Sequence, residues 1–284
     1  MSEPFEVIAS GYQFCEAPRT TPDGGIWFSD LTGGGYHHVA ADGSKRTVVP
    51  DRIWIGGATL DRQDALLIGG KGGLVLAERG EARPILTEID GRPIVAVNDF
   101  EACPDGSIYG GTLDLAAVFE RNEAPTPGHF FHLAPGGEPT LLRDDVIATN
   151  GIGFSPDGGT LYHAESTVGI WAWRMAEGRV AGQPDLFAKA DDCDGLVVDA
   201  EGRVWVAYWR DAVIRRYRPD GLIDREIALP FPHLVSLCFG GPDLTDLYVT
   251  TGASESRPDA GGVIRIRSDV PGLPTHRSAF SSGA

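Results

Sequence analysis

Residues 156–166, PDGGTLYHAES, combine a tight turn with the start of a strand. Pro156 fixes its own φ, Asp157 can bond its own backbone, and Gly158 and Gly159 accept positive φ. After the turn, apolar and polar residues alternate, which is typical of a half-buried strand. The stretch therefore predicts a turn between two antiparallel strands.

The same unit of turn and strand recurs along the chain. Strong copies are PDGGIWFSD at 22–30, PDGSIYGGTLD at 104–114 and AEGRVWVAYWR at 200–210. Weaker copies are RQDALLIGG at 62–70 and GPDLTDLYVTTG at 241–252. Six units spaced roughly 40 to 50 residues apart match the blade period of a β-propeller. We therefore predict an all-β fold, a six-bladed β-propeller that forms a single domain over residues 1–284.

The two ends of the chain are expected to meet in one blade. The opening strand, FEVIASGYQF at 5–14, has no turn unit of its own, and the last unit ends with GGVIRIRSD at 261–269. Pairing of the N-terminal strand into the last blade closes the ring and removes exposed sheet edges. The insert LAAVFERNEAPTPGHF at 115–130 is expected to be a long surface loop or an extension of a hairpin.

Composition excludes several classes of partner. A formal net charge of −16 repels nucleic-acid phosphates and anionic lipid surfaces. The longest apolar stretch, ALLIGGKGGLVLA at 65–77, is too short and too interrupted to span a membrane, and the N-terminus lacks the pattern of a signal peptide. The four cysteines show no CxxC spacing and are expected to be reduced thiols. We expect a cytoplasmic protein without nucleic-acid or membrane partners; the oligomeric state is left open.

One offset from the turn selects an oxygen-bearing side chain in each strong unit. The acidic residues of the four turns are Asp23, Asp105, Asp157 and Glu201. The residues that stand seven positions before them are, in the same order, Glu16, Asn98, Asn150 and Asp194. In the two weaker units the same offset gives Gly57 and Ser236. The innermost strand of each propeller blade lines the central channel, so equivalent positions converge on the axis. The four side chains are therefore predicted to form a ring of oxygens.

Such a ring suits a divalent cation. Two carboxylates that face one another in a dry channel repel or take up a proton unless a cation lies between them. Two carboxylates and two amide oxygens are ligands for calcium, magnesium or manganese, whereas the absence of His and Cys disfavours a structural zinc site. Taken alone, Asn-Gly at 150–151 is more typical of a turn. Four matches at one offset favour the metal site.

Two further residues have alternative interpretations. His163 follows the Asn150 turn on a strand, where it either edges the site or belongs to the core. Trp54 either packs inside its blade or lines the end of the channel.

Four segments carry a resemblance to a known family. They are CEAPRTTPDGGIWFSD at 15–30, VNDFEACPDGSIYGGTLD at 97–114, TNGIGFSPDGGTLYHAEST at 149–167 and CDGLVVDAEGRVWVAYW at 193–209. In this order they resemble the family that includes gluconolactonases, senescence marker protein and the luciferin-regenerating enzyme. The resemblance covers essentially the whole chain. It implies a six-bladed propeller with one catalytic divalent metal on its axis, and lactone hydrolysis as the activity.

The resemblance also implies roles for individual residues. Glu16, Asn150 and Asp194 are implied to be the metal ligands, while Asn98 lies beside the ion and contacts the substrate or a metal-bound water. Calcium fits this ligand set. Because members of the family differ in the metal they prefer, zinc, manganese, magnesium and ferrous iron are alternatives. Many sugar lactonases of the family carry an Arg where this chain has Ala96. Loss of that donor favours a less hydroxylated lactone or another ester.

The function predicted from these observations is metal-dependent opening of a small-molecule lactone. The ion polarises the carbonyl and water attacks. Asp194 acts as general base, either directly or by holding a metal-bound water, and Asn98 orients the substrate. One alternative is hydrolysis of organophosphate triesters at the same metal site. The other is a propeller that binds a partner without catalysis and holds a cation only for stability.

Overall fold

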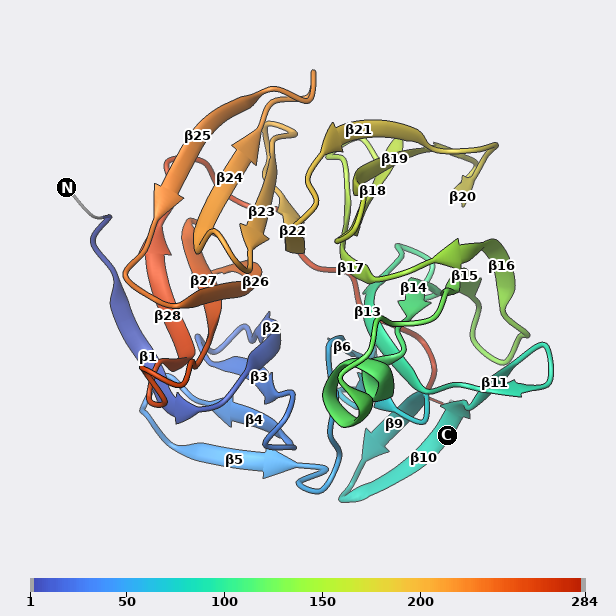
Figure 1. Ribbon diagram of the computed structural model, residues 1–284, viewed down its shortest axis with the longest axis horizontal. Helices are drawn as coiled ribbons and strands as arrows, with labels where there is room; N and C mark the ends of the chain where they lie inside the picture. Colours follow the sequence, from blue (N-terminus) through green and yellow to red (C-terminus); the bar gives the residue numbers. More distant parts are fainter. Residues whose placement is uncertain (1–2, 282–284) are drawn as a thin grey trace.

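Six β-sheets of four or five strands stand around a central channel like the blades of a propeller (Figure 1). The computed structural model describes residues 3–281. The predicted all-β, six-bladed β-propeller is confirmed. That the chain forms a single domain over residues 1–284 stays a prediction.

Each blade is built from consecutive antiparallel strands. Blade 1 contains β2 (Cys15–Thr20), β3 (Ile26–Asp30), β4 (Tyr36–Val39) and β5 (Lys45–Val48). Blade 2 contains β6 (Ala58–Leu60), β7 (Leu66–Ile68), β9 (Leu74–Glu78) and β10 (Glu81–Leu86). Blade 3 contains β13 (Ala96–Ala102), β14 (Ile108–Thr112), β15 (Gly128–Leu133) and β16 (Thr140–Val146), and β8 (Gly70–Lys71) adds to β13.

The remaining blades follow the same order. Blade 4 contains β17 (Thr149–Phe154), β18 (Thr160–Glu165), β19 (Gly169–Ala176), β20 (Arg179–Val180) and β21 (Asp185–Lys189). Blade 5 contains β22 (Cys193–Val198), β23 (Val204–Tyr208), β24 (Val213–Tyr217) and β25 (Ile223–Ala228). Blade 6 contains β26 (His233–Gly240), β27 (Asp246–Gly252), β28 (Gly261–Arg267) and β1 (Glu6–Tyr12). A separate hairpin pairs β11 (Glu88–Ile89) with β12 (Arg92–Pro93).

The innermost strands form a closed ring. Each of β2, β6, β13, β17, β22 and β26 contacts the innermost strand of the next blade, and β26 contacts β2. Apolar side chains from neighbouring blades pack between the sheets, as in the cluster of Trp205, Leu247 and Ile264 from blades 5 and 6. This packing fixes the inner strands and hence the side chains that face the channel.

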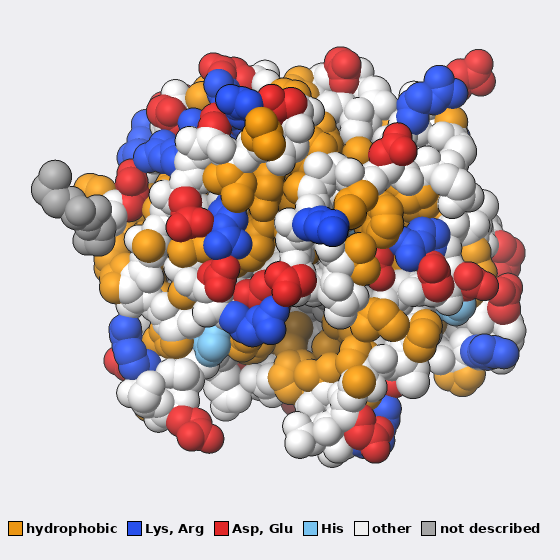
Figure 2. Space-filling model, turned by 45° about the horizontal axis from the view of Figure 1, so that its top comes forward, with side chains coloured by type: hydrophobic (Ala, Val, Ile, Leu, Met, Phe, Trp, Pro, Cys, Tyr) orange, Lys and Arg blue, Asp and Glu red, His pale blue; other side chains and the backbone are white. Residues whose placement is uncertain are grey.

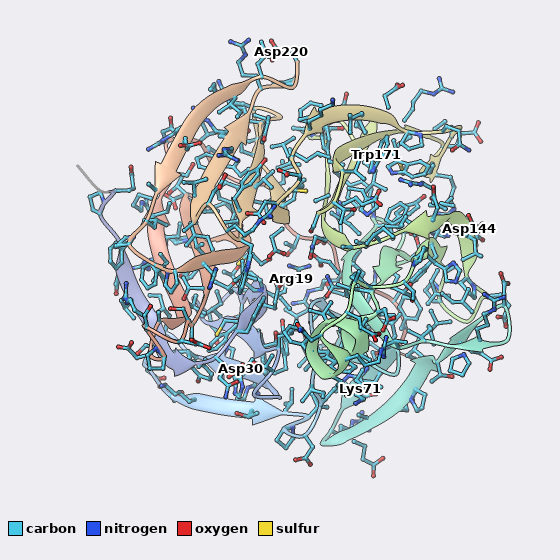
Figure 3. The ribbon with its side chains drawn as sticks, in the orientation of Figure 1. Arg19, Asp30, Lys71, Asp144, Trp171 and Asp220 are labelled. Carbon is cyan, nitrogen blue, oxygen red and sulfur yellow. The ribbon has the colours of Figure 1, made fainter. Side chains whose placement is uncertain are left out.

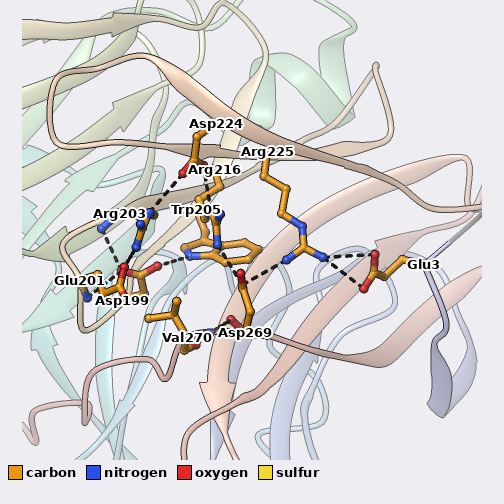
Figure 4. Close-up of polar contacts among 11 residues, drawn as sticks. Glu3, Asp199, Glu201, Arg203, Trp205, Arg216, Asp224, Arg225, Asp269 and Val270 are labelled. Atoms are coloured by element: carbon orange, nitrogen blue, oxygen red, sulfur yellow. Dashed lines mark hydrogen bonds and ion pairs between the residues drawn. The ribbon is translucent and has the colours of Figure 1, made fainter.

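The predicted closure of the ring is confirmed. β1 pairs antiparallel with β28, so the N-terminal strand becomes the outer strand of blade 6. A chain of ion pairs ties this end to blade 5: Arg225 contacts both Glu3 and Asp269, and Arg216 contacts Asp269 and Asp224 (Figure 4).

The predicted turns lie at one end of the blades. The Asp157 carboxylate accepts a hydrogen bond from Gly159 N at 2.9 Å, and Asp105 accepts one from Ser107 N at 2.9 Å. Gly158 has φ +67°, a conformation that glycine adopts without strain. We call this the turn end of the channel, and the opposite end, where the inner strands begin, the entry end.

The insert at 115–130 connects β14 to β15 at the entry end. It contains the one helix of the described residues, the short π-helix η1 (Ala117–Arg121). The Asp114 carboxylate accepts from Ala117 N at 3.0 Å and pairs with Arg121, which anchors the helix. Lys71 contacts Glu120 at 2.7 Å.

After β28 the chain crosses the turn end of the channel. Gly272 N donates to Leu244 O at 2.8 Å in blade 6, and Ser278 N donates to Leu60 O at 3.0 Å in blade 2. The segment between them, residues 273–277, therefore runs across the turn end from blade 6 to blade 2. All four cysteines are buried and free. Within residues 3–281, no helix has the length and apolarity needed to cross a membrane.

Candidate active site

Four side chains singled out in the sequence come from four inner strands at the entry end. We call them the hub: Glu16 on β2, Asn98 on β13, Asn150 on β17 and Asp194 on β22. Asn98 Nδ2 donates to Asn150 Oδ1 at 2.9 Å and to Thr149 O at 2.8 Å. Glu16 and Asp194 are 5% and 8% exposed. The offset of seven residues thus selects three buried polar side chains and the partly buried Asn150, which is in direct contact with Asn98.

A β-bulge lies at or beside the offset position in five of the six blades. In β13, β17 and β22 the register shifts between residues 97 and 100, 149 and 152, and 193 and 196, which leaves one extra residue on the inner strand. β2 and β26 carry the same irregularity, at 16–19 and 234–237. Bulges re-aim side chains and are enriched beside active sites. The shared bulge explains why one sequence offset selects equivalent positions.

Blade 2 lacks both the bulge and an oxygen-bearing side chain at the offset position, because Asn98 of the neighbouring blade 3 fills the space there. A Cβ on Gly56 would stand 2.3 Å from Asn98 Oδ1, and one on Gly57 would stand 2.7 Å from Asn98 O. Larger residues at these two positions would therefore collide with Asn98.

The Asn-Gly and Asp-Gly pairs belong to strands and form no turn. A Cβ on Gly151 would lie 2.0 Å from Leu196 N on the next inner strand. One on Gly195 would lie 2.3 Å from Ser236 Oγ. Each glycine after a hub residue allows close approach of neighbouring inner strands. Ser236, the offset residue of blade 6, therefore lies against the backbone that follows Asp194.

The hub carboxylates carry an electrostatic conflict. Burial, followed by the charges of Asp194 and Asp99, raises the pKa of Glu16 well above its usual range. Burial, followed by the charges of Asp99 and Asp192, raises the pKa of Asp194 in the same way. Within residues 3–281, no hydrogen bond reaches the Asp194 carboxylate, and Glu16 Oε2 accepts only from Ala17 N at 3.3 Å. Buried carboxylates are normally paired with a cation or with several donors.

Charged residues that the sequence analysis missed lie deeper in the channel. Arg19 lies at the centre of the ring (Figure 3) and contacts Glu101 at 2.9 Å. The pKa of Asp99 is raised to about 7. Burial is the main cause, and the charge of Arg19 partly offsets it. Strict alternation along β2 places Arg19 and Glu16 on opposite faces, but the bulge between them lets both reach the channel.

Ser166 is a second residue that sequence reasoning missed. Asn150 Nδ2 donates to Ser166 Oγ, which donates in turn to Cys193 O at 2.6 Å. This contact uses the nitrogen of the amide, so Asn150 presents its oxygen, Oδ1, on the side of Asn98. Ser166 follows β18 at the entry end. In the sequence, only its nearness to the turn unit of Asn150 pointed to a role for Ser166 in the site.

His163 and Trp54 are core residues in this structure. His163 is fully buried, stacks on Phe130 with ring centroids 4.0 Å apart, and contacts Thr149 Oγ1 at 3.2 Å. Trp54 is 3% exposed, packs in a cluster with Ala96 and Leu113, and lies beneath the Lys71 ammonium at 4.4 Å. Through this cluster Trp54 packs at the entry end of the channel.

Several aromatic side chains pack against one another at the entry end. Trp209 lies between Phe14, whose ring centroid is 4.6 Å away, and His233, at 3.7 Å. Phe119 of η1 meets the edge of Phe14 at 6.3 Å. Ala96, at the position of the Arg seen in many sugar lactonases, is fully buried in the cluster with Trp54. Hydrophobic side chains border a hollow near the centre of the face in Figure 2.

The donor set of the hub fits a divalent cation. It offers two carboxylates and an amide oxygen, all hard oxygen ligands, and neither carboxylate forms an ion pair within residues 3–281, although the charge of Arg19 partly lowers the pKa of Glu16. No group of three or more His, Cys, Asp or Glu side chains suited to a metal occurs within residues 3–281. The hub is not such a group, because two of its four members are amides.

Comparison with known proteins identifies the family. Residues 14–253 match the SMP-30/Gluconolactonase/LRE-like region. The chain belongs to this family. It is 28% identical to a regucalcin of Xenopus laevis, with 92% of each chain covered, and 28% identical to a pentonolactonase of Haloferax volcanii, with 98% of each covered.

Solved structures of the family share the fold. A calcium-binding protein, regucalcin, from Agrobacterium tumefaciens superposes with a TM-score of 0.83 at 22% identity, covering 99% of both chains. The resemblance seen in the four sequence segments is thereby confirmed.

Proposed function

We propose that this protein is a divalent-metal-dependent hydrolase that opens a small lactone. The observation that carries the proposal is the pair of buried carboxylates, Glu16 and Asp194, whose pKa values are raised by burial and by neighbouring negative charge. Membership of a family that contains gluconolactonases, and 28% identity to a pentonolactonase along 98% of the chain, support lactone hydrolysis. Glu16, Asn150 and Asp194 would hold the ion, with calcium the preferred candidate.

Each hub residue has a role in the proposed reaction. A bound divalent cation would polarise the lactone carbonyl and stabilise the charge that develops on its oxygen. Asp194, which has no hydrogen-bond partner within residues 3–281, accepts a proton from the attacking water. The water oxygen bonds to the carbonyl carbon, the ring C–O bond breaks, and the leaving oxygen takes up a proton. The product is the open-chain hydroxy acid.

Asn98 contacts Asn150 before any substrate is bound. Both protons of its Nδ2 are engaged, one by Thr149 O and one by Asn150 Oδ1. In this arrangement Asn98 fixes the position of Asn150. To orient substrate, as we also propose, it releases one of these two hydrogen bonds when the substrate binds.

The substrate is proposed to be a lactone with few hydroxyl groups, or a related ester. Ala96 supplies no hydrogen-bonding side chain, and the rings of Phe14 and Trp209 stack at the entry end. A site that offers apolar surface in place of a donor gains little from a polyhydroxylated ring, because the hydroxyl groups lose water without finding partners.

The test is a reconstitution experiment. Protein stripped with a chelator is refilled separately with calcium, zinc, manganese, magnesium or ferrous iron, and acid release is followed with alkyl lactones, sugar lactones and a phosphotriester. We expect at least one ion to restore lactone hydrolysis, with alkyl lactones preferred. Failure of every ion to restore hydrolysis would show that the proposal is wrong.

A pair of variants separates catalysis from folding. Asp194→Asn is expected to abolish hydrolysis while the metal-free protein remains folded, since the change removes a buried charge that nearby carboxylates repel. Asp157→Asn alters an exposed carboxylate at the turn end and should retain full activity. If the protein only binds a partner and is not a catalyst, the wild type and both variants would show no turnover.

A further inference from the structure

Ser236 stands in the inner ring between the two buried carboxylates of the hub. The inner strand of blade 6, β26, contacts β22 on one side and β2 on the other. Blade 6 therefore separates Asp194 on β22 from Glu16 on β2. Ser236 occupies the position of blade 6 that corresponds to these two residues, seven before Asp243. The reaction proposed above assigns it no role.

On the side of blade 5, Ser236 lies directly against the residue that follows Asp194. A Cβ placed on Gly195 would stand 2.3 Å from Ser236 Oγ and 2.5 Å from Ser236 Cα. Because Gly195 has no side chain, the serine hydroxyl occupies that space. The hydroxyl therefore lies beside the chain segment that carries the proposed general base.

On the side of blade 1, the register of β2 and β26 brings Ser236 level with Glu16. A Cβ on Gly240 would stand 2.4 Å from Thr20 Cγ2, so these two residues are neighbours. Both strands run from the entry end to the turn end, and each carries a bulge in the equivalent place. Four residues back from Thr20 and Gly240 stand Glu16 and Ser236.

The Ser236 hydroxyl is held in place and has no partner. Ser236 is 5% exposed, and Thr250 Oγ1 accepts from Ser236 N at 2.8 Å and donates to Ser236 O at 3.3 Å. These contacts use the backbone, and no hydrogen bond within residues 3–281 involves Ser236 Oγ. In this part of the chain, the side-chain polar atoms that lack both a partner and contact with solvent belong to seven other residues. Ser236 Oγ is therefore accessible to a water molecule.

An unpartnered hydroxyl beside a general base suits the attacking water. A water held by a single hydrogen bond to Asp194 can pivot about it, so its lone pair is poorly aimed at the carbonyl carbon. A second hydrogen bond fixes the water: one O–H donates to Asp194 and the other donates to Ser236 Oγ, which leaves a lone pair for the carbonyl carbon. The hydroxyl is neutral and adds no charge beside two carboxylates that already repel each other.

We propose that Ser236 is a catalytic residue, which holds the attacking water together with Asp194. This role rests on the proposed hydrolysis of a lactone. One proton of the water passes to Asp194 and the water oxygen bonds to the carbonyl carbon, while Ser236 keeps its own proton and forms no covalent bond. Packing against Gly195 requires only a small side chain at position 236, and the hydroxyl exceeds that requirement.

Ser236→Ala separates the hydroxyl from the space it occupies, because alanine keeps the Cβ and fits beside Gly195. With the lactone and the ion that give the highest activity, we expect the variant to lower kcat about tenfold at an unchanged KM, since the lost hydrogen bond is made to the reacting water. Ser107→Ala removes a buried hydroxyl at the turn end and is the matched control, which should keep the wild-type kcat. Equal kcat in all three proteins would overturn the proposal.

Two binding measurements distinguish the water from other partners of this hydroxyl. Isothermal titration of the metal-free proteins with calcium should give the same affinity for the wild type and Ser236→Ala. A weaker affinity of the variant would make Ser236 a ligand of the ion and refute its role toward water. A lactam with the ring of the best lactone should inhibit both proteins equally, whereas weaker inhibition of the variant would assign the hydroxyl to the substrate carbonyl and also refute that role.

Failure of this role differs from failure of the proposed function. If the wild type opens no lactone with any ion, the proposed hydrolysis is wrong and the role of Ser236 is wrong with it. If the wild type is active and Ser236→Ala matches it, only the role of Ser236 is wrong. Urea unfolding of the metal-free proteins shows whether a loss of activity in the variant arises from a loss of the fold.

Discussion

Asn150 is oriented by a short chain of hydrogen bonds. Its Nδ2 donates to Ser166 Oγ, and Ser166 donates to Cys193 O, the residue that precedes Asp194. The chain links two predicted metal ligands on neighbouring inner strands. Residues that hold a ligand through a hydrogen bond commonly contribute one to two orders of magnitude to metal affinity.

Ser166→Ala should therefore weaken calcium binding about 10- to 100-fold. The variant removes the acceptor of Asn150 Nδ2, so the amide keeps only its contact with Asn98 and is held less firmly, while both carboxylates remain. Isothermal titration of the metal-free protein with calcium measures the effect. Ser155→Ala, which removes a hydroxyl bonded to Asp157 at the turn end, is the control and should bind calcium as the wild type does. Unchanged affinity in Ser166→Ala would exclude this positioning role.

His163 predicts a pH dependence of stability. Burial, with a smaller effect of the Arg143 charge, lowers the pKa of His163 to about 3. In the unfolded chain its pKa is about 6.5. Between these values the unfolded chain binds a proton that the folded protein does not. The contribution of His163 is therefore fully favourable above pH 6.5 and declines by about 1.4 kcal/mol per unit as the pH falls.

His163→Phe should remove this slope. Between pH 7.5 and pH 5 the wild type is expected to lose about 2 kcal/mol more unfolding free energy than the variant. Urea denaturation of both proteins at the two pH values measures the difference. Titration of the hub carboxylates affects both proteins alike and cancels in the comparison. Parallel pH profiles would show that His163 is not held neutral.

At the scale of the element, the bulged inner strand is the unit that builds the site. β17 carries Asn150 in its bulge, and β22 carries Asp194 in the same place. Gly151 lets the two strands approach, since a Cβ there would lie 2.0 Å from Leu196 N. The bulge and the glycine act together, one by aiming the side chain and the other by bringing the next strand close.

Gly151→Ala should cost roughly 1 to 3 kcal/mol of unfolding free energy, because the contact is with backbone that cannot rotate away. It should also weaken calcium binding, because β17 and β22 are forced apart. Gly137→Ala is the matched control, for a Cβ there meets its nearest atom at an ordinary 3.5 Å. Urea unfolding and calcium titration of both variants provide the measurements. Equal stability of the two would show that the inner strands adjust without cost.

The sequence predicts the elements that repeat and misses those that occur once. The turn units and the oxygen at the offset position are predictable because each recurs in several blades. Arg19 and Asp99 are missed, since the bulge breaks the two-residue alternation on which the prediction of facing side chains depends. The C-terminal segment over the turn end and the helix η1 are also missed, because neither has a periodic pattern.

At the scale of the whole molecule, the ring is closed by two segments distant in sequence. β1 covers the edge of β28, with Ala9 buried and Tyr12 meeting the edge of Phe28 at 4.9 Å. Outside this pairing, Arg225 joins Glu3 to Asp269 through partly exposed ion pairs. Exposed ion pairs contribute little, whereas strand pairing and burial contribute more.

Deletion of residues 1–13 should therefore destabilise the propeller by about 3 kcal/mol, the loss expected when the buried Ala9 and the partly buried Ile8 and Tyr12 leave the cluster against which they pack. It also leaves the edge of β28 unpaired, and unpaired edges associate with other chains. Deletion of residues 1–3, which removes the ion pair of Glu3 with Arg225, should cost less than about 1 kcal/mol. Urea unfolding and size-exclusion chromatography compare the two. If the longer deletion keeps the oligomeric state and the stability of the wild type, the strand pairing of β1 adds nothing to closure, and β26, β27 and β28 must suffice to hold the last blade on the ring.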